Sequence, residues 1–87
     1  SGLVYKVQFY TSPKKLELKD KRFQDVSDVD VYFHNGLFKY TSGAFTRLET
    51  AVNSQNQIRK AGFTDAFVAA FLNGERISMD EAKRLQP

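Results

Sequence analysis

The chain has 87 residues, enough for a single small domain. Thirteen Lys and Arg residues against ten Asp and Glu residues give a formal net charge of +3, a mild excess that suits an anionic partner without requiring one. The absence of Cys excludes disulfides and thiolate metal sites, and with a single His we expect neither a metal site nor a cofactor. No apolar run approaches the roughly 20 residues of a membrane span.

The start of the chain predicts a domain taken from a longer protein. Ser1-Gly2 stands directly before the first expected strand and is typical of a cloning remnant. Without a signal peptide in these 87 residues, we expect either a cytosolic protein or a domain cut from a longer chain. We expect the domain proper to span residues 3–78, followed by a short C-terminal helix over residues 79–87.

Residues 3–10 alternate between apolar and polar side chains, which predicts a half-buried strand. Every second residue from Tyr5 to Phe9 is expected to face the core. The positions expected on the opposite, open face are Lys6, Gln8 and Tyr10.

Residues 14–25 carry few large apolar side chains among many charges. Two interpretations stay open. The segment is an extended crossover with a short helical turn near residues 19–23, or it is a full first helix.

Residues 29–34 alternate again, with Val29, Val31 and Phe33 expected on the core face. Asn35-Gly36 follows, a pair that tolerates the positive φ angles of a type I′ hairpin turn. Residues 37–42 are therefore expected to return antiparallel, with their even-numbered side chains toward the core.

Thr46 to Glu49 has the pattern of a capping box, which predicts the start of an amphipathic helix that ends at Gly62. Residues 66–72 are almost continuously apolar and predict a strand in which Phe67 and Phe71 belong to the core. Asn73-Gly74 predicts a turn after this strand.

Ser78 to Glu81 forms a second capping box, which predicts the short terminal helix from Met79 to about Gln86. The order of the elements predicts an α+β fold of the βαββαβ, ferredoxin-like or RNP-like type. Its four-stranded antiparallel sheet would have helices on one face and the first and third strands in the centre.

Several segments resemble one family. Tyr5-Lys6-Val7-Gln8 is similar to the hydrophobic-x-Val-Gln opening of the SPOR (sporulation-related repeat) domain. Residues 38–45, FKYTSGAF, are similar to that family's third strand, an aromatic-Arg-Val-x-Val-Gly-Pro-Phe pattern. Ala51 and Gly62-Phe63 match the family's helix and its exit. Residues 65–77 also resemble SPOR domains appended to bacterial N-acetylmuramoyl-L-alanine amidases.

The resemblance implies a noncatalytic, monomeric module that binds peptidoglycan on its exposed sheet face. Its ligand would be glycan strands stripped of their stem peptides, which accumulate at division septa. The module would lie in the periplasm or cell envelope, as part of a longer exported protein such as an amidase, without inserting into the membrane. Gln8 and Thr11 match the family's first-strand contacts, and Leu37 and Lys39 match its third-strand contacts.

The residue types on the open face are also suited to sugars. Amides, hydroxyls and imidazoles form hydrogen bonds with sugar hydroxyl and N-acetyl groups, aromatic rings stack on sugar faces, and a cation pairs with a carboxylate. The candidate glycan-binding residues are Gln8, Tyr10, Thr11, Tyr32, His34, Leu37, Lys39 and Thr41. The alternative for each is an ordinary solvated or cross-strand position in the sheet.

Other functions have less support in the sequence. We expect no enzyme, because there is no Ser-His-Asp signature and no Gly-rich phosphate loop. Single-stranded RNA binding by an RNA-recognition motif uses the same architecture, but its third-strand consensus is absent here, so we expect no nucleic-acid partner. A protein-interaction module without a ligand is the remaining alternative.

Overall fold

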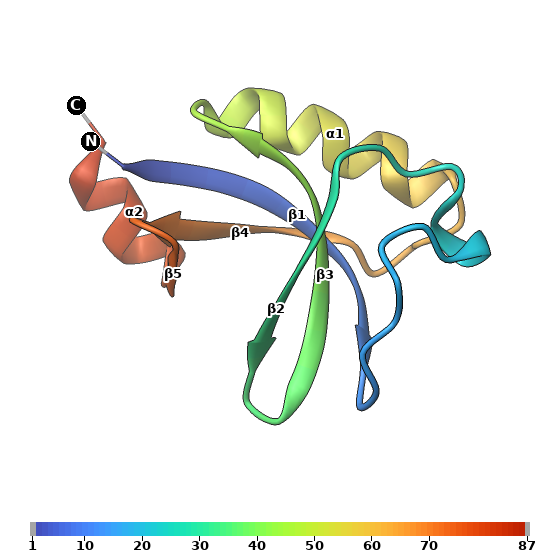
Figure 1. The fold of residues 1–87 in the computed structure, drawn as a ribbon. Coiled ribbons are helices and arrows are strands. Elements are labelled where there is room, and N and C mark those ends of the chain that lie inside the picture. The colour runs from blue at the N-terminus through green and yellow to red at the C-terminus, as the bar shows by residue number, and fades with distance from the viewer. Residues whose placement is uncertain (1, 87) are drawn as a thin grey trace.

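The computed structural model describes residues 2–86 and shows an α+β fold around one strongly curled antiparallel sheet (Figure 1). The strands lie in the spatial order β2-β3-β1-β4-β5, and every neighbouring pair is antiparallel. Their bounds are β1 Leu3–Ser12, β2 Val29–His34, β3 Leu37–Phe45, β4 Phe67–Leu72 and β5 Glu75–Ile77. The expected number of four strands is wrong, because the chain turns back after β4 and adds β5 at the sheet edge.

Two α-helices accompany the sheet. Helix α1 (Leu48–Lys60) crosses one face, and helix α2 (Met79–Leu85) lies beside β5 and the start of β1 (Figure 1). Between β1 and β2 the chain forms no regular helix other than one 3₁₀ turn, η1 (Lys21–Phe23), with a turn on either side of it, so the first interpretation of residues 14–25 is confirmed. Ser1 of the expected remnant and Pro87 of the expected C-terminal helix lie outside the described residues.

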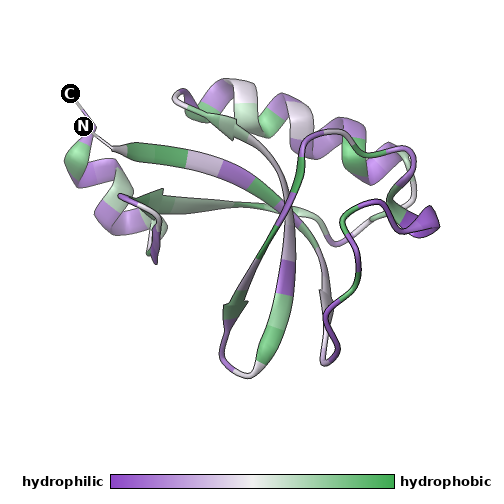
Figure 2. Cartoon of the chain, in the orientation of Figure 1, coloured by the Kyte–Doolittle hydropathy of each residue, from purple (hydrophilic) through white to green (hydrophobic). Residues whose placement is uncertain are grey.

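The core lies between the sheet and the segments that cover it, namely α1, η1 and α2, and it has two parts. The first contains Val7, Phe9, Phe23, Tyr40 and Ile58, with Val26 and Ala66. The second contains Leu3, Tyr5, Ala51, Ala70 and Ala82. Figure 2 shows hydrophobic residues along much of β4, whereas α1 alternates between hydrophobic and hydrophilic positions because only one of its faces is buried.

Two β-bulges lie between β1 and β3, one on each strand. On β3, Gly43 and Ala44 together oppose the single residue Lys6. On β1, Phe9 is the extra residue, because Gln8 pairs with Thr41 and Tyr10 with the next residue, Tyr40. Bulges bend a strand and increase its local twist, which accounts for the curl of this sheet.

The expected turns form, and one of the two expected caps does. Asn35-Gly36 has φ angles of 52° and 78°, and Asn73-Gly74 has 50° and 88°, as left-handed turn residues require. The Ser78 hydroxyl accepts a hydrogen bond from the Glu81 amide at 3.1 Å and caps α2. The predicted cap at Thr46 is wrong, because α1 begins at Leu48 after Arg47, which makes no side-chain cap.

Candidate functional site

The sheet face turned away from α1 is called the concave face below, because the edge strands approach one another across it. The cross-strand pairs place on it Lys6, Gln8 and Thr11 of β1; Asp30, Tyr32 and His34 of β2; Leu37, Lys39 and Thr41 of β3; Phe67, Ala69 and Phe71 of β4; and Arg76 of β5. Seven of the eight predicted site residues thus share this face, and the exception is Tyr10, which is described below.

A hydrogen-bond network joins three strands on the concave face. The Tyr32 hydroxyl of β2 donates to Gln8 Oε1 of β1 at 2.5 Å. Arg76 of β5 donates from Nη1 to the Tyr32 hydroxyl oxygen at 3.1 Å and reaches Gln8 Oε1 at 3.5 Å. Partial burial raises the pKa of the Tyr32 hydroxyl, although the nearby Arg76 charge acts in the opposite direction.

Much of the concave face is filled by its own side chains. The Tyr32 ring packs edge-on against Phe71 of β4, with 5.1 Å between ring centroids, and the Lys6 ammonium lies 5.1 Å from the Phe71 ring. Gln8 is only 5% exposed and Thr41 only 1%. The expectation of a bare β surface is therefore wrong at its centre, because the curl brings β2 over β1 and β4.

An open groove remains at one end of this face, between the tip of the β2–β3 hairpin and β5. Its volume is about 550 Å³, within the range of small-ligand sites. The polar and aromatic side chains that line it are His34, Asn35, Lys39, Phe67, Arg76 and Ser78. A second hollow of about 290 Å³ also borders Phe67, and it is lined further by Gln8, Phe9, Tyr10, Thr11 and Asp65.

The groove carries positive charge. Lys39 Nζ donates to His34 Nδ1 at 2.9 Å. Partial burial and then the charges of Lys39 and Arg76 lower the pKa of His34. The two ion pairs among residues 2–86 are Lys6–Asp30 and Arg22–Asp20, so neither Lys39 nor Arg76 is neutralised by a carboxylate within this part of the chain.

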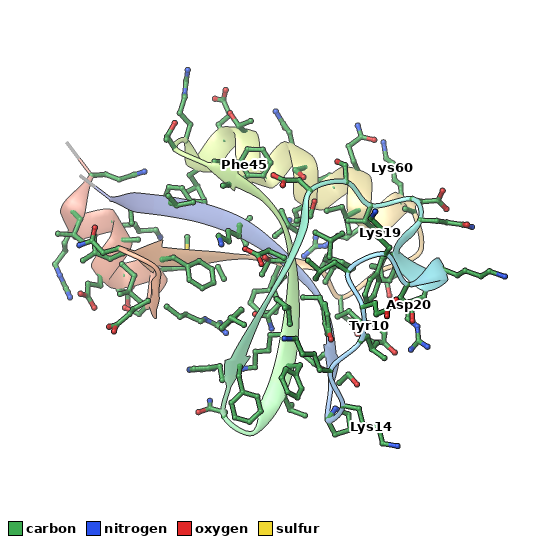
Figure 3. All side chains as sticks on the ribbon, in the orientation of Figure 1. Tyr10, Lys14, Lys19, Asp20, Phe45 and Lys60 are labelled. Carbon is green, nitrogen blue, oxygen red and sulfur yellow. The ribbon has the colours of Figure 1, made fainter. Side chains whose placement is uncertain are left out.

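Tyr10 was expected on this face and lies on the opposite one. The bulge at Phe9 turns Tyr10 to the core face, where its ring lies 5.4 Å from Phe23 and 6.2 Å from Tyr40. Its hydroxyl accepts a hydrogen bond from Arg22 at 2.9 Å, and Figure 3 shows it on the same side of the sheet as Asp20.

The remaining predicted site residues differ in how far their side chains are exposed to solvent. Thr11 is exposed and pairs with Lys39 across the strands, so it lies near the groove. Leu37 is half-buried beside His34 at the hairpin tip. Thr41 lies under the Tyr32–Gln8 contact and offers no exposed surface.

Two aromatic residues expected in the core are exposed. Phe67 is 38% exposed on the concave face, where the Arg76 guanidinium lies 5.5 Å from its ring. Phe33 is 62% exposed on the opposite face and packs against Phe38 near the hairpin tip, beyond the reach of α1. Phe71 is 4% exposed, but it is buried on the concave face.

Arg76 and Phe67 line the groove, although neither was among the residues predicted for the site. The signal for Arg76 was present, because Asn73-Gly74 is a hairpin turn and a hairpin turn requires a following strand. Phe67 was assigned to the core because an almost continuous apolar strand predicts burial on both faces.

Within residues 2–86 no helix has the length and apolar character to cross a membrane, and no cluster of His, Asp and Glu side chains is arranged to hold a metal ion. Comparison of the chain with protein-family models, with curated proteins and with solved structures finds no match. The family resemblance of residues 4–77 therefore depends on the sequence motifs alone.

Proposed function

We propose that this domain is a noncatalytic module that binds peptidoglycan glycan strands lacking stem peptides, and so directs a longer envelope protein, such as an amidase, to the cell wall. The observation that carries the proposal is the groove on the concave face. It combines hydrogen-bonding groups, cations and an exposed ring at His34, Lys39, Arg76 and Phe67. A ferredoxin-like ancestry of the sheet, with β5 as an added edge strand, is part of the same proposal.

The shape of the face is suited to a chain of sugars rather than to one small molecule. Phe67 lines both the larger groove and the second hollow, so its ring stands between them. A strand of sugars that crosses this ring places one sugar face on it and extends into both hollows. Aromatic rings supply the apolar, rigid contact that sugar faces need.

Binding of peptide-free wall is the direct test. Purified sacculi are mixed with the protein before and after digestion by an amidase, and the bound fraction is measured by pull-down. We expect binding to increase with removal of the stem peptides. Binding that stays constant or falls contradicts the proposal.

Two aromatic substitutions locate the binding face. Phe67→Ala is expected to reduce binding to digested sacculi about tenfold or more, because it removes the ring between the two hollows. Phe33→Ala is the matched control, since Phe33 is exposed on the opposite face. Equal losses in both variants would assign the effect to something other than the groove.

The RNA-binding alternative lacks the rings that it needs. RNA-recognition motifs stack bases on aromatic side chains of the central strands. Here the central strands β1 and β3 present Lys6, Gln8, Leu37, Lys39 and Thr41 on the concave face, and none is aromatic. A gel shift with single-stranded RNA that weakens steeply with salt would favour this alternative.

A further inference from the structure

The hydrogen bond between Lys39 and His34 exists in only one protonation state of His34. Lys39 Nζ lies 2.9 Å from His34 Nδ1, and a lysine ammonium can only donate. His34 Nδ1 therefore accepts, and the neutral ring carries its proton on Nε2. A protonated imidazole has a proton on both nitrogens and cannot accept this bond.

The charged groups that face His34 are cations. Partial burial, and then the charges of Lys39 on β3 and Arg76 on β5, lower the pKa of His34. The Tyr32 ring lies 6.0 Å away on β2, and burial raises its pKa, so it is uncharged at neutral pH. The other elements around the groove contribute uncharged side chains, namely Phe67 and Ala69 from β4, Met79 from α2 and Ser78 from the N-cap of that helix.

We propose that this groove is an anionic subsite in which a carboxylate of the sugar ligand binds Lys39 and Arg76 while His34 takes up one proton. The inference rests on the proposed glycan-binding function, and it adds the chemical group recognised and the response to pH. In a peptide-free glycan that group is the lactyl carboxylate of muramic acid, which the stem peptide otherwise occupies as an amide. The only bond that forms is Nδ1–H, its proton comes from solvent, and the sugar ligand itself is unchanged.

The two events favour each other for a physical reason. A carboxylate offsets the two cations that oppose protonation of His34. Protonation of Nδ1 removes the acceptor that holds the Lys39 ammonium, which then turns to the carboxylate. Proton uptake and carboxylate binding are thus linked.

The sign of the pH dependence follows from this linkage. The ligand-bound protein holds the His34 proton more tightly than the free protein, so affinity increases as pH falls through the window between the two pKa values. For each unit by which the ligand raises the pKa of His34, the Kd at pH values below that window is tenfold lower. The Kd does not change with pH above the pKa that His34 has in the ligand-bound protein. It is also constant below the pKa that His34 has in the free protein.

His34 is the only histidine of the chain, so its ring signals in an NMR spectrum report this proton directly. The probes are N-acetylmuramic acid, which carries the carboxylate, and N-acetylglucosamine, which does not. We expect the first sugar to raise the His34 pKa and to bind at least about threefold more tightly at about pH 5.5 than at about pH 8. N-acetylglucosamine is expected to do neither.

Three variants distinguish pH-dependent carboxylate binding through His34 from a general loss of structure. His34→Gln keeps an acceptor for Lys39 but does not titrate, so it should bind N-acetylmuramic acid with a Kd independent of pH in this range. Lys39→Gln should weaken that binding about tenfold and raise the free His34 pKa. Lys60→Gln makes the same charge change on exposed α1, as Figure 3 shows, and should leave both quantities unchanged.

The possible outcomes distinguish this inference from the proposed function. Digested sacculi that bind equally at both pH values, or His34→Gln that keeps the pH dependence, overturn the inference and leave the glycan-binding function standing. No binding of sacculi, with the response to N-acetylmuramic acid intact, overturns the function and leaves the anionic subsite. No response of His34 to N-acetylmuramic acid overturns the inference.

Discussion

The Tyr32 hydroxyl donates a hydrogen bond to Gln8 Oε1 at 2.5 Å although strand β3 lies between their two strands. In a flat sheet, side chains two strands apart are separated by roughly 9–10 Å, so this bond requires the sheet to curl toward the concave face. Thr41, which pairs with Gln8 on β3, is covered as a result. The contact thus determines how much of the concave face stays open.

Removal of this hydroxyl should destabilise the protein. In Tyr32→Phe, the buried Gln8 oxygen keeps only the long contact with Arg76, and we expect a loss of about 1–2 kcal/mol in the free energy of unfolding. Urea denaturation at neutral pH measures it. Tyr10→Phe is the matched control, because its hydroxyl bonds an exposed Arg22, and a change below about 0.5 kcal/mol is expected. Equal losses would show that the network contributes nothing specific.

A different tyrosine should behave in the opposite way. The Tyr5 hydroxyl is buried without a hydrogen-bond partner among residues 2–86, so Tyr5→Phe removes a desolvation cost and should leave stability unchanged or raise it by up to about 1 kcal/mol. Tyr40→Phe, in contrast, removes hydrogen bonds to both the amide and the carbonyl of Leu16, and should cost about 1–2 kcal/mol. Thermal unfolding of the pair checks the order, and a loss in Tyr5→Phe as large as that in Tyr40→Phe contradicts it.

The caps of the two helices should differ in their response to substitution. Ser78→Ala removes the acceptor for the Glu81 amide and should cost about 1 kcal/mol, with faster hydrogen exchange in α2. Thr46→Ala is expected to stay within about 0.5 kcal/mol, because α1 begins after Arg47 and has no side-chain cap. A larger effect at Thr46 than at Ser78 would contradict this order and would mean that Thr46 caps α1.

The bulge at Gly43 should resist substitution. Its φ is 80°, and an added Cβ would lie 2.4 Å from the Phe45 ring, so Gly43→Ala should destabilise the protein by more than about 1 kcal/mol. Gly62→Ala shares a positive φ but meets nothing within 4 Å, and should cost less. Chemical denaturation of both variants separates steric conflict from backbone strain, and equal costs would exclude the ring contact as a cause.

His34 should also make stability depend on pH in the absence of any ligand. Its pKa is lowered in the folded protein, so between the folded and unfolded pKa values the unfolded chain binds more protons. Stability therefore falls as pH decreases below the unfolded value of about 6.5 and becomes level below the folded pKa. The urea midpoint measured across this range should decrease with falling pH in the unsubstituted protein, and it should decrease less in His34→Gln. Identical profiles would mean that neither burial nor the charges of Lys39 and Arg76 lower the pKa of His34 in the folded protein.

Strands β1 to β4, the β2–β3 hairpin and helix α1 were predictable from local patterns, whereas β5 was not predicted. Alternation predicted residues 29–34 as a strand with the bounds that β2 has, and Asn35-Gly36 predicted the hairpin because a type I′ turn needs two residues with positive φ. The central positions of the first and third strands followed from right-handed crossovers. The shared face of Gln8 and Lys39 also followed from alternation along β1 and β3.

Tertiary structure alone decided where alternation breaks and how deep each side chain lies. The bulge at Phe9 moved Tyr10 to the core because pairing with Tyr40, rather than strict alternation, sets its face. Curling buried Gln8 and Thr41 and left Phe67 exposed at the groove. The residue pattern along one strand is a local property, whereas bulges and curl depend on the neighbouring strands with which that strand pairs. The sequence therefore determined the elements and the composition of the face, and the sheet decided which of those residues a ligand can reach.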